Sequence, residues 1–238
     1  MLKLNKKTKS IKVFLITLLT VFSLSFFSGC DEDNPLNPVN PQAFLSVVHA
    51  SPNAPNVDII YGSITAATDV PYLSRLAYIP VTGNSVTNLR INAAGTSTTV
   101  IDTALYMEEN KSYTVFVYDS LASIKPLFLN DDLSSPGSIN ANVRFLHLSP
   151  NGPTVDVGVS GKTTPWFAFE SFSQYTSFRP VTGQMYDSLN VYPAGTPTVF
   201  YTKSNVNFEP GRIYTIIANG FVGGTGTQAF GLTIYRNN

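Results

Sequence analysis

The sequence His49-Ala-Ser-Pro-Asn-Ala-Pro-Asn-Val-Asp-Ile59 returns 98 residues later as His147-Leu-Ser-Pro-Asn-Gly-Pro-Thr-Val-Asp-Val157, with seven of the eleven positions identical. Shorter stretches repeat at nearly the same spacing: Pro80-Val-Thr-Gly83 with Pro180-Val-Thr-Gly183, and Ala94-Gly-Thr96 with Ala194-Gly-Thr196. Because this spacing barely drifts, the chain contains one module twice. We expect the copies to span 42–135 and 139–238, joined by a linker at 136–138.

Within each copy, the apolar residues recur with a period of two rather than 3.6. Tyr113, Val115 and Val117 alternate with three other residues along 112–118, and Val155, Val157 and Val159 do so in the second copy. Short runs of this kind, ended by Gly, Pro, Asn or Ser, are typical of strands joined by turns. Six or seven such runs per copy predict an all-β protein made of two tandem antiparallel β-sandwich domains of immunoglobulin-like type.

The first 29 residues have the pattern of a secretory signal peptide, because five lysines precede an apolar run at 13–27. The run ends in Phe27-Ser-Gly-Cys30, which contains the only cysteine and resembles the lipobox of bacterial lipoproteins. The resemblance implies cleavage before Cys30, lipidation of its thiol and attachment to a membrane. The alternative is an ordinary signal peptide that leaves a free thiol.

Residues 30–41 are rich in Asn-Pro dipeptides and poor in apolar residues, which predicts an extended tether. Its acidic run Asp31-Glu-Asp33 has three interpretations: a calcium ligand, a solvated charge run, or an export signal. In the third, it resembles the acidic signal that Bacteroidota place after the lipidated cysteine. That resemblance implies display on the outer face of the outer membrane.

Charge argues against nucleic acid as a partner. Five of the 15 Lys and Arg residues precede Gly29, which leaves ten against 15 Asp and Glu in the chain after the expected cleavage site. Phosphate binding requires clustered positive charge, and this chain has a negative balance. No cofactor motif is present either: Gly223-Gly-Thr-Gly226 lacks the following Lys-Ser/Thr of a phosphate loop and predicts a hairpin tip.

The repeated motif contains the residue types of a hydrolase triad, as His49, Ser51 and Asp58. Alternation places His49 on the same face as Leu45 and Val47, and therefore in the core. By the same rule, the aspartate points away from the core. We therefore interpret the motif as structural, with a neutral histidine that donates to a turn carbonyl. The residues assigned to this structural role are His49, Ser51, Pro52, Asp58, His147, Ser149, Pro150 and Asp156.

A metal site is not expected, because the chain has only two histidines, one in each copy. The pair Asp131-Asp132 in the first copy has two interpretations. It either helps to bind a hard cation such as calcium, or it satisfies backbone groups in the turn between the domains.

Aromatic residues gather in Pro165-Trp-Phe-Ala-Phe-Glu-Ser-Phe-Ser-Gln-Tyr175, which contains the only tryptophan. The matching stretch of the first copy, 65–75, lacks this enrichment. Because exposed Trp and Tyr side chains stack on sugars and dominate protein interfaces, this difference predicts a ligand-binding surface. The candidate binding residues are Trp166, Phe167, Phe169 and Tyr175. In the alternative interpretation, Trp166 and Phe172 fill the core.

Taken together, the His-x-Ser-Pro-Asn-x-Pro-x-Val-Asp motif, the Pro-x-x-Gly and Ala-Gly-Thr turns and the Tyr-Thr-Val/Ile strand resemble a bacterial domain of unknown function, DUF4397. The first copy closes with Leu129-Asn-Asp-Asp-Leu133, whereas the second ends in Tyr235-Arg-Asn-Asn238 without the aspartate pair. The resemblance implies tandem β domains in an exported protein, and it implies no activity.

The sequence therefore predicts a non-enzymatic lipoprotein of the cell surface, for binding, adhesion or structure. The first alternative is a glycan-binding accessory lipoprotein of an outer-membrane uptake system. The second is a hydrolase that uses His49, Ser51 and Asp58. The expected partners are the membrane, through the lipid on Cys30, and a surface glycan or protein.

Overall fold

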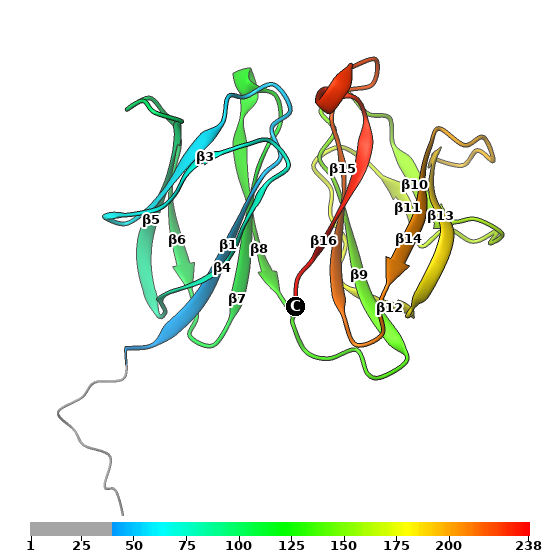
Figure 1. The fold of residues 1–238 in the computed structure, drawn as a ribbon, viewed down its shortest axis with the longest axis horizontal. Helices are drawn as coiled ribbons and strands as arrows, with labels where there is room; N and C mark the ends of the chain where they lie inside the picture. Colours follow the sequence, from blue (N-terminus) through cyan, green and yellow to red (C-terminus); the bar gives the residue numbers. More distant parts are fainter. Residues whose placement is uncertain (1–39) are drawn as a thin grey trace, which may run out of the picture. The chain divides into compact units, whose positions relative to one another are not determined.

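The structure, a computed structural model, describes residues 40–238, which belong to one compact unit (Figure 1). The expected signal peptide at 1–29, the expected lipidation site Cys30 and the tether up to residue 39 lie outside the described residues. Across 40–238, none of the helices has the length and apolar character needed to cross a membrane.

The first sandwich consists of two four-stranded sheets. One sheet has the order β4-β1-β7-β8, and the other has the order β3-β2-β5-β6. The strands of the first sheet are β1 (Gln42–His49), β4 (Arg75–Thr82), β7 (Ser112–Tyr118) and β8 (Lys125–Asp131). Those of the second are β2 (Val57–Tyr61), β3 (Ile64–Val70), β5 (Ser85–Ala93) and β6 (Thr99–Met107).

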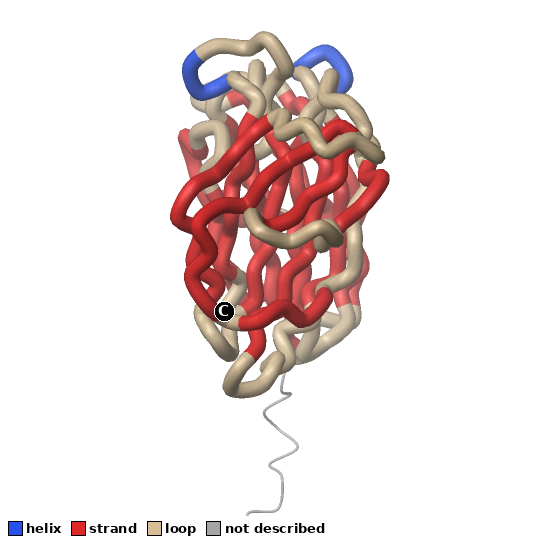
Figure 2. The backbone as a smooth tube through the Cα atoms, turned by 90° about the vertical axis from the view of Figure 1, so that its right-hand side faces the viewer, coloured by secondary structure: helices blue, strands red, loops and turns tan. Residues whose placement is uncertain are grey.

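The second sandwich repeats this arrangement, with sheets ordered β12-β9-β15-β16 and β11-β10-β13-β14. Its first sheet contains β9 (Asn140–His147), β12 (Arg179–Thr182), β15 (Ile213–Asn219) and β16 (Gly231–Arg236). Its second sheet contains β10 (Val155–Val159), β11 (Phe167–Glu170), β13 (Gln184–Pro193) and β14 (Tyr201–Phe208). Two short 3₁₀ turns, η1 (Leu121–Ser123) and η2 (Gly226–Gln228), occupy corresponding loops at the same end of the strands (Figure 2).

The predicted all-β fold with two tandem sandwiches is confirmed, with two differences in detail. Each sandwich has eight strands rather than six or seven. One pairing in each is parallel, β1 with β7 and β9 with β15. The parallel pairing arises because β1 and β2 belong to opposite sheets, so the chain crosses the sandwich instead of turning back beside β1. The His-x-Ser-Pro-Asn-x-Pro-x-Val-Asp motif is this crossing.

Close backbone contacts explain why the Pro-Val-Thr-Gly turn occurs in both copies. A Cβ atom on Gly83 would lie 2.9 Å from the Cα of Glu109, and one on Gly183 would lie 2.7 Å from the Cα of Pro210. Side chains do not tolerate contacts this short, so glycine is required at both turns.

Each sandwich has its own core between its two sheets. In the first, large buried side chains include Leu45, Ile59, Leu89, Ile91 and Met107. In the second, Phe145, Leu189 and Phe208 play the same part. Every one of these side chains is fully buried, so each copy fills its interior independently of the other.

A third apolar cluster joins the two sandwiches through the outer faces of the β1 and β9 sheets. Val48 and Phe116 of the first copy pack with Leu146, Leu148 and Ile217 of the second. Val48 and Leu146 occupy the same position in their respective strands, so the two copies meet through the same face of the same sheet. Ser46 and Arg144 also lie on this face, and both are buried there.

Candidate functional site

The His49 side chain is fully buried and bonds to the turn that follows it. Its Nε2 atom lies 3.0 Å from the carbonyl oxygen of Pro55. Ser51, also buried, donates from Oγ to the carbonyl oxygen of Asp119 at 2.6 Å. The two carboxylate oxygens of Asp58 accept hydrogen bonds from the backbone N–H groups of Asp69 (2.8 Å) and Gly95 (3.0 Å).

The second copy makes the same bonds at the corresponding positions. His147 Nε2 lies 2.9 Å from the carbonyl oxygen of Pro153, and Ser149 donates to the carbonyl oxygen of Gly220 at 2.7 Å. Asp156 accepts from the N–H groups of Phe169 and Gly195 at 2.7 and 2.9 Å. In each copy, side-chain to backbone hydrogen bonds of the repeated motif therefore hold the sheet crossing together and connect it to two loops and to one strand, β3 or β11. Pro52 and Pro150 lie within this crossing.

This arrangement does not have the geometry of a nucleophilic triad, in which serine, histidine and aspartate bond to one another. Each of these hydrogen bonds runs to a backbone group instead. Burial lowers the pKa of His49 and of His147, against the opposing effect of the hydrogen bonds that the rings make to the carbonyl oxygens of Pro55 and Pro153. Both imidazoles are therefore neutral near pH 7, and a neutral ring donates from Nε2 to the turn carbonyl.

The pair Asp131-Asp132 was expected to bind a cation or to satisfy backbone groups in the turn between the domains. Asp132 does accept from the backbone N–H of Ser134 at 3.0 Å, whereas Asp131 does not serve that turn. It is buried, and its Oδ1 lies 2.5 Å from Nη2 of Arg144 in the second copy. Its Oδ2 accepts from the hydroxyls of Tyr78 (2.6 Å) and Thr114 (2.5 Å). The described residues contain no group of three or more His, Cys, Asp or Glu side chains placed to hold a metal ion.

The four candidate aromatic residues do not form a single surface. Phe167 lies in the core, 4% exposed and stacked on Phe145 with ring centroids 5.7 Å apart. Its inclusion in a binding surface is therefore corrected, because β11 directs Phe167 into the core. Phe169 and Tyr175 are exposed, at 67% and 53%. Tyr175 lines a separate depression that also includes residues of β8.

Phe169 has an unusual backbone for its residue type. Its φ angle is +59°, in the left-handed region that large side chains rarely adopt. The corresponding residue of the first copy is Asp69, with φ +53°, and aspartate tolerates this region better. At this position the first copy has Asp69, which tolerates the left-handed conformation, whereas the second copy has Phe169, whose large ring is exposed on a strained backbone. Strain of this kind is found preferentially at functional sites.

Trp166 is half-buried and lines an open hollow of about 590 Å³ in the second sandwich. Its ring packs edge-to-face on Tyr186, with centroids 5.2 Å apart, and against Phe208 at 5.6 Å. Arg179 donates from Nη1 to the carbonyl oxygen of Trp166. The hollow is lined by Val159, Lys162, Thr163, Thr164, Pro165, Trp166, Arg179, Pro180, Val181, Thr182, Gln184 and Tyr186.

The first sandwich has a hollow of about 490 Å³ at the corresponding place, with different chemistry. Strand pairing fixes the correspondence: β1 pairs Leu45 with Ile79, and β9 pairs Val143 with Arg179. By the same reasoning, Ala66 corresponds to Trp166. The first hollow is thus lined by Ala66 and Ile79, with Pro41 of the incoming chain beside them. Sequence comparison of the copies detected the tryptophan, but it missed Arg179 and Tyr186.

These features define a tandem β-sandwich protein in which the repeated motif has a structural role. Of the two copies within residues 40–238, only the second has a hollow that is lined by both aromatic and cationic side chains. The chain belongs to the DUF4397 family, described as a domain of unknown function, whose profile matches residues 43–158 and 141–238. The resemblance found in the sequence is therefore confirmed.

Other comparisons add no functional argument. A search of curated proteins gives no match. Among solved structures, the chain is similar to the crystal structure of CBMbc (family CBM26) from Eubacterium rectale Amy13K in complex with maltoheptaose. The identity is 11%, the likeness covers 81% of this chain and 96% of that one, and the TM-score is 0.27. That score is too low to support an inference about fold or ligand.

Proposed function

We propose that this protein is a non-enzymatic binding protein of the cell surface, and that its ligand occupies the hollow of the second sandwich. The observation that carries this proposal is the difference between the two copies at one place. Where the first copy has Ala66 and Ile79, the second has Trp166 and Arg179. A duplicated structural core has no need of such a change, whereas a binding site formed by one copy does.

The lipid anchor is part of the same proposal. Its support is the stretch Phe27-Ser-Gly-Cys30 after a basic and apolar leader, followed by the acidic run Asp31-Glu-Asp33. A protein attached in this way would present two rigid sandwiches from a proline-rich tether. Labelling of growing cells with a radioactive fatty acid, compared between the natural chain and C30S, tests the anchor. Loss of the label in C30S is expected.

A glycan-binding accessory lipoprotein of an uptake system is the second candidate. One specific observation favours a sugar as the ligand: Trp166 and Tyr186 form an aromatic wall in an open hollow, next to threonine hydroxyls and the Gln184 amide. Aromatic rings with nearby hydrogen-bonding groups are the usual means by which proteins hold sugar rings.

The only tryptophan of the chain provides the test. The full chain, purified in a neutral detergent, is screened against an array of glycans and against surface proteins of neighbouring cells. Binding is then measured by isothermal titration calorimetry for the natural chain and every variant, and also by the fluorescence of Trp166 where that residue is present. We expect W166A to abolish binding and Y106A, which removes an exposed ring from the first sandwich, to leave it intact. Equal binding by W166A would contradict the assignment of the hollow.

A further inference from the structure

We propose that the ligand of the second hollow is an acidic saccharide: a sugar ring on Trp166 whose carboxylate or sulfate group pairs with Lys162 and Arg179. This inference rests on the proposed function and adds the chemical class of the ligand. It depends on the charges around the hollow, on the difference between the two copies, and on the position of the Arg179 side chain.

The charged residues that line the second hollow, Lys162 and Arg179, are both cationic. No aspartate or glutamate is among the described residues of its lining. This is notable because residues 40–238 contain ten Lys and Arg against twelve Asp and Glu. A cationic site on a chain of negative charge attracts an anion locally, whereas the rest of the surface repels it.

The first sandwich shows that the fold does not need these charges. Its hollow has no charged residue among the described residues of the lining, and Ile79 occupies the position of Arg179. Three differences therefore occur together in the second copy: Arg179, Trp166, and Tyr186 at the position of Val86. Such a joint change is expected when a cation and an aromatic surface serve one ligand.

Arg179 is exposed, but its position is fixed from two sides. Nη1 donates to the carbonyl oxygen of Trp166, and the guanidinium carbon lies 5.9 Å from the centroid of the Phe167 ring. A guanidinium has five N–H donors, and the bond to Trp166 is made by one nitrogen. The anchored side chain thus keeps further N–H donors in the same hollow that Trp166 lines.

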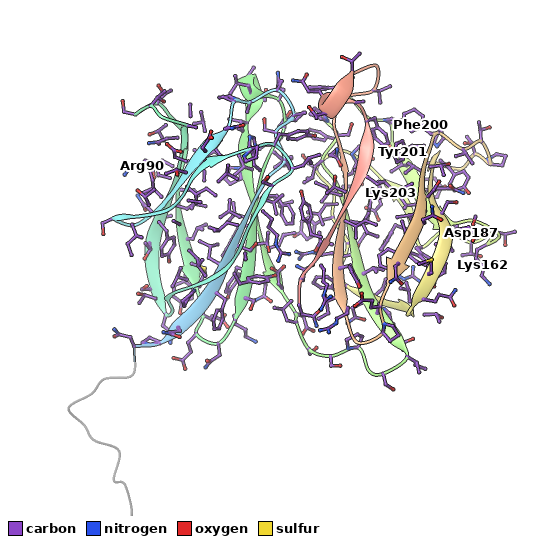
Figure 3. All side chains as sticks on the ribbon, viewed as in Figure 1. Arg90, Lys162, Asp187, Phe200, Tyr201 and Lys203 are labelled. Carbon is purple, nitrogen blue, oxygen red and sulfur yellow. The ribbon has the colours of Figure 1, made fainter. Side chains whose placement is uncertain are left out.

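Lys162 lies on the loop after β10, on the side of the second sandwich that faces away from the first (Figure 3). It is exposed, and so is Asp187, which follows Tyr186 on β13 and does not line the hollow. An acidic ligand would therefore meet Arg179 beside Trp166 and Lys162 at the margin. This arrangement favours an extended, repeatedly charged saccharide over a single phosphate, which gains nothing from an aromatic wall.

The experiment compares matched saccharides that differ in charge alone. Oligogalacturonate, alginate, hyaluronan and chondroitin sulfate fragments are titrated into the full chain in neutral detergent. The methyl esters of their carboxylates, made after desulfation in the case of chondroitin sulfate, serve as uncharged counterparts. Trp166 fluorescence reports binding. At least one acidic probe should bind about tenfold or more tightly than its neutral form, and raising NaCl from about 50 to about 500 mM should weaken it markedly, because surface charges are screened.

Single substitutions test which side chains cause the preference for an acidic saccharide. R179A and K162A should each weaken the acidic probe by about three- to tenfold, and R179K should restore part of the loss. R90A is the matched control, because Arg90 is an exposed arginine of the first sandwich (Figure 3) and its removal changes the net charge equally. Neither R90A nor D187N should weaken binding.

The outcomes separate this inference from the proposed function. If neutral and acidic forms bind equally and R179A has no effect, the hollow binds a ligand but the acidic class is wrong. If no saccharide of either kind changes Trp166 fluorescence while a surface protein does, the inference also fails and the binding function stands. If nothing binds through Trp166, both are wrong.

Discussion

Nη2 of Arg144 lies 2.5 Å from Oδ1 of Asp131, and this ion pair joins the two sandwiches in a fully desolvated layer. Both side chains are almost completely inaccessible to solvent. Hydroxyl donors from Tyr78 and Thr114 satisfy the second carboxylate oxygen, and Arg144 Nε donates to Thr215 at 2.9 Å. The pair is therefore embedded in a hydrogen-bonded network that extends into both copies.

Removing one partner of this pair should strongly destabilise the protein, since a buried charge is left uncompensated. We expect D131A to lower the free energy of unfolding by about 3–5 kcal/mol in denaturant titrations. The double variant D131L/R144M, which removes both charges, should lose less than D131A alone. D132A is the control, because Asp132 is exposed, and it should stay within about 0.5 kcal/mol of the natural chain. A small loss in D131A would show that water reaches the layer.

The two copies of the sheet crossing should respond alike to loss of their aspartates. D58A and D156A each leave two backbone N–H groups without their acceptors. Because these groups are near solvent, we expect each variant to lose about 1–2 kcal/mol of stability. Binding by the Trp166 hollow should persist in D58A. A catalytic role for the motif would instead require loss of an activity with little change in the melting temperature.

The histidines should make the protein less stable in mild acid. Their pKa values are lowered by burial in the folded state, so the unfolded chain binds protons first as the pH falls below about 6.5. Above that pH both states are neutral and the histidines contribute no pH dependence. Below it, each histidine should reduce stability by up to about 1.4 kcal/mol per pH unit, until the folded state is also protonated.

The control for this effect is the double variant H49Q/H147Q, in which glutamine can still donate to Pro55 and Pro153. Its melting temperature should fall less steeply between pH 6.5 and 5 than that of the natural chain. Carboxylates contribute to both proteins equally, so the difference isolates the two imidazoles. If the melting temperatures of the two proteins fall in parallel with pH, the two imidazoles are protonated in the folded protein without a loss of stability.

Replacing Phe169 by a residue that tolerates its left-handed backbone should stabilise the protein. F169N removes an exposed ring from left-handed backbone and should raise stability by about 0.5–1 kcal/mol. F169A separates the two effects, since alanine lacks the ring but keeps an unfavourable φ. The reverse change in the first copy, D69F, should be destabilising and would also remove the bond from Asn56 to the Asp69 carboxylate. Destabilisation by F169N would show that the Phe169 ring is supported by contacts.

The sequence was sufficient to predict the sandwiches, because alternation and turn residues are local properties. Along β1, Val47 and His49 point to one face of the sheet, and Ser46 and Val48 point to the other. The alternation along each strand therefore indicates which face of its sheet lies in the core of the sandwich. The same pattern says nothing about what covers the other face. Arg144 is buried because a second copy packs over it, and only the folded chain brings Asp131 to it.

The candidate site was predicted less completely, for a related reason. Comparing the copies residue by residue indicated the segment around Trp166. It did not indicate that Phe167 turns inward, because that orientation depends on how β11 pairs with β10. It also missed Arg179, which lies 13 residues after Trp166 and belongs to β12, a strand of the opposite sheet that pairs with β9.

The contact between the same faces of the two copies is, in effect, a dimer interface placed within one polypeptide. Two separate molecules would part on dilution, whereas covalently joined partners remain together at any level of expression. Joining also removes the requirement that both partners be identical. Arg144 opposite Asp131, with Ser46 and Asn237 at the matching positions, is a combination that a pair of identical subunits could not adopt. Both copies keep the hydrogen bonds of the repeated motif, and the second copy differs from the first in having Trp166 and Arg179 at the hollow.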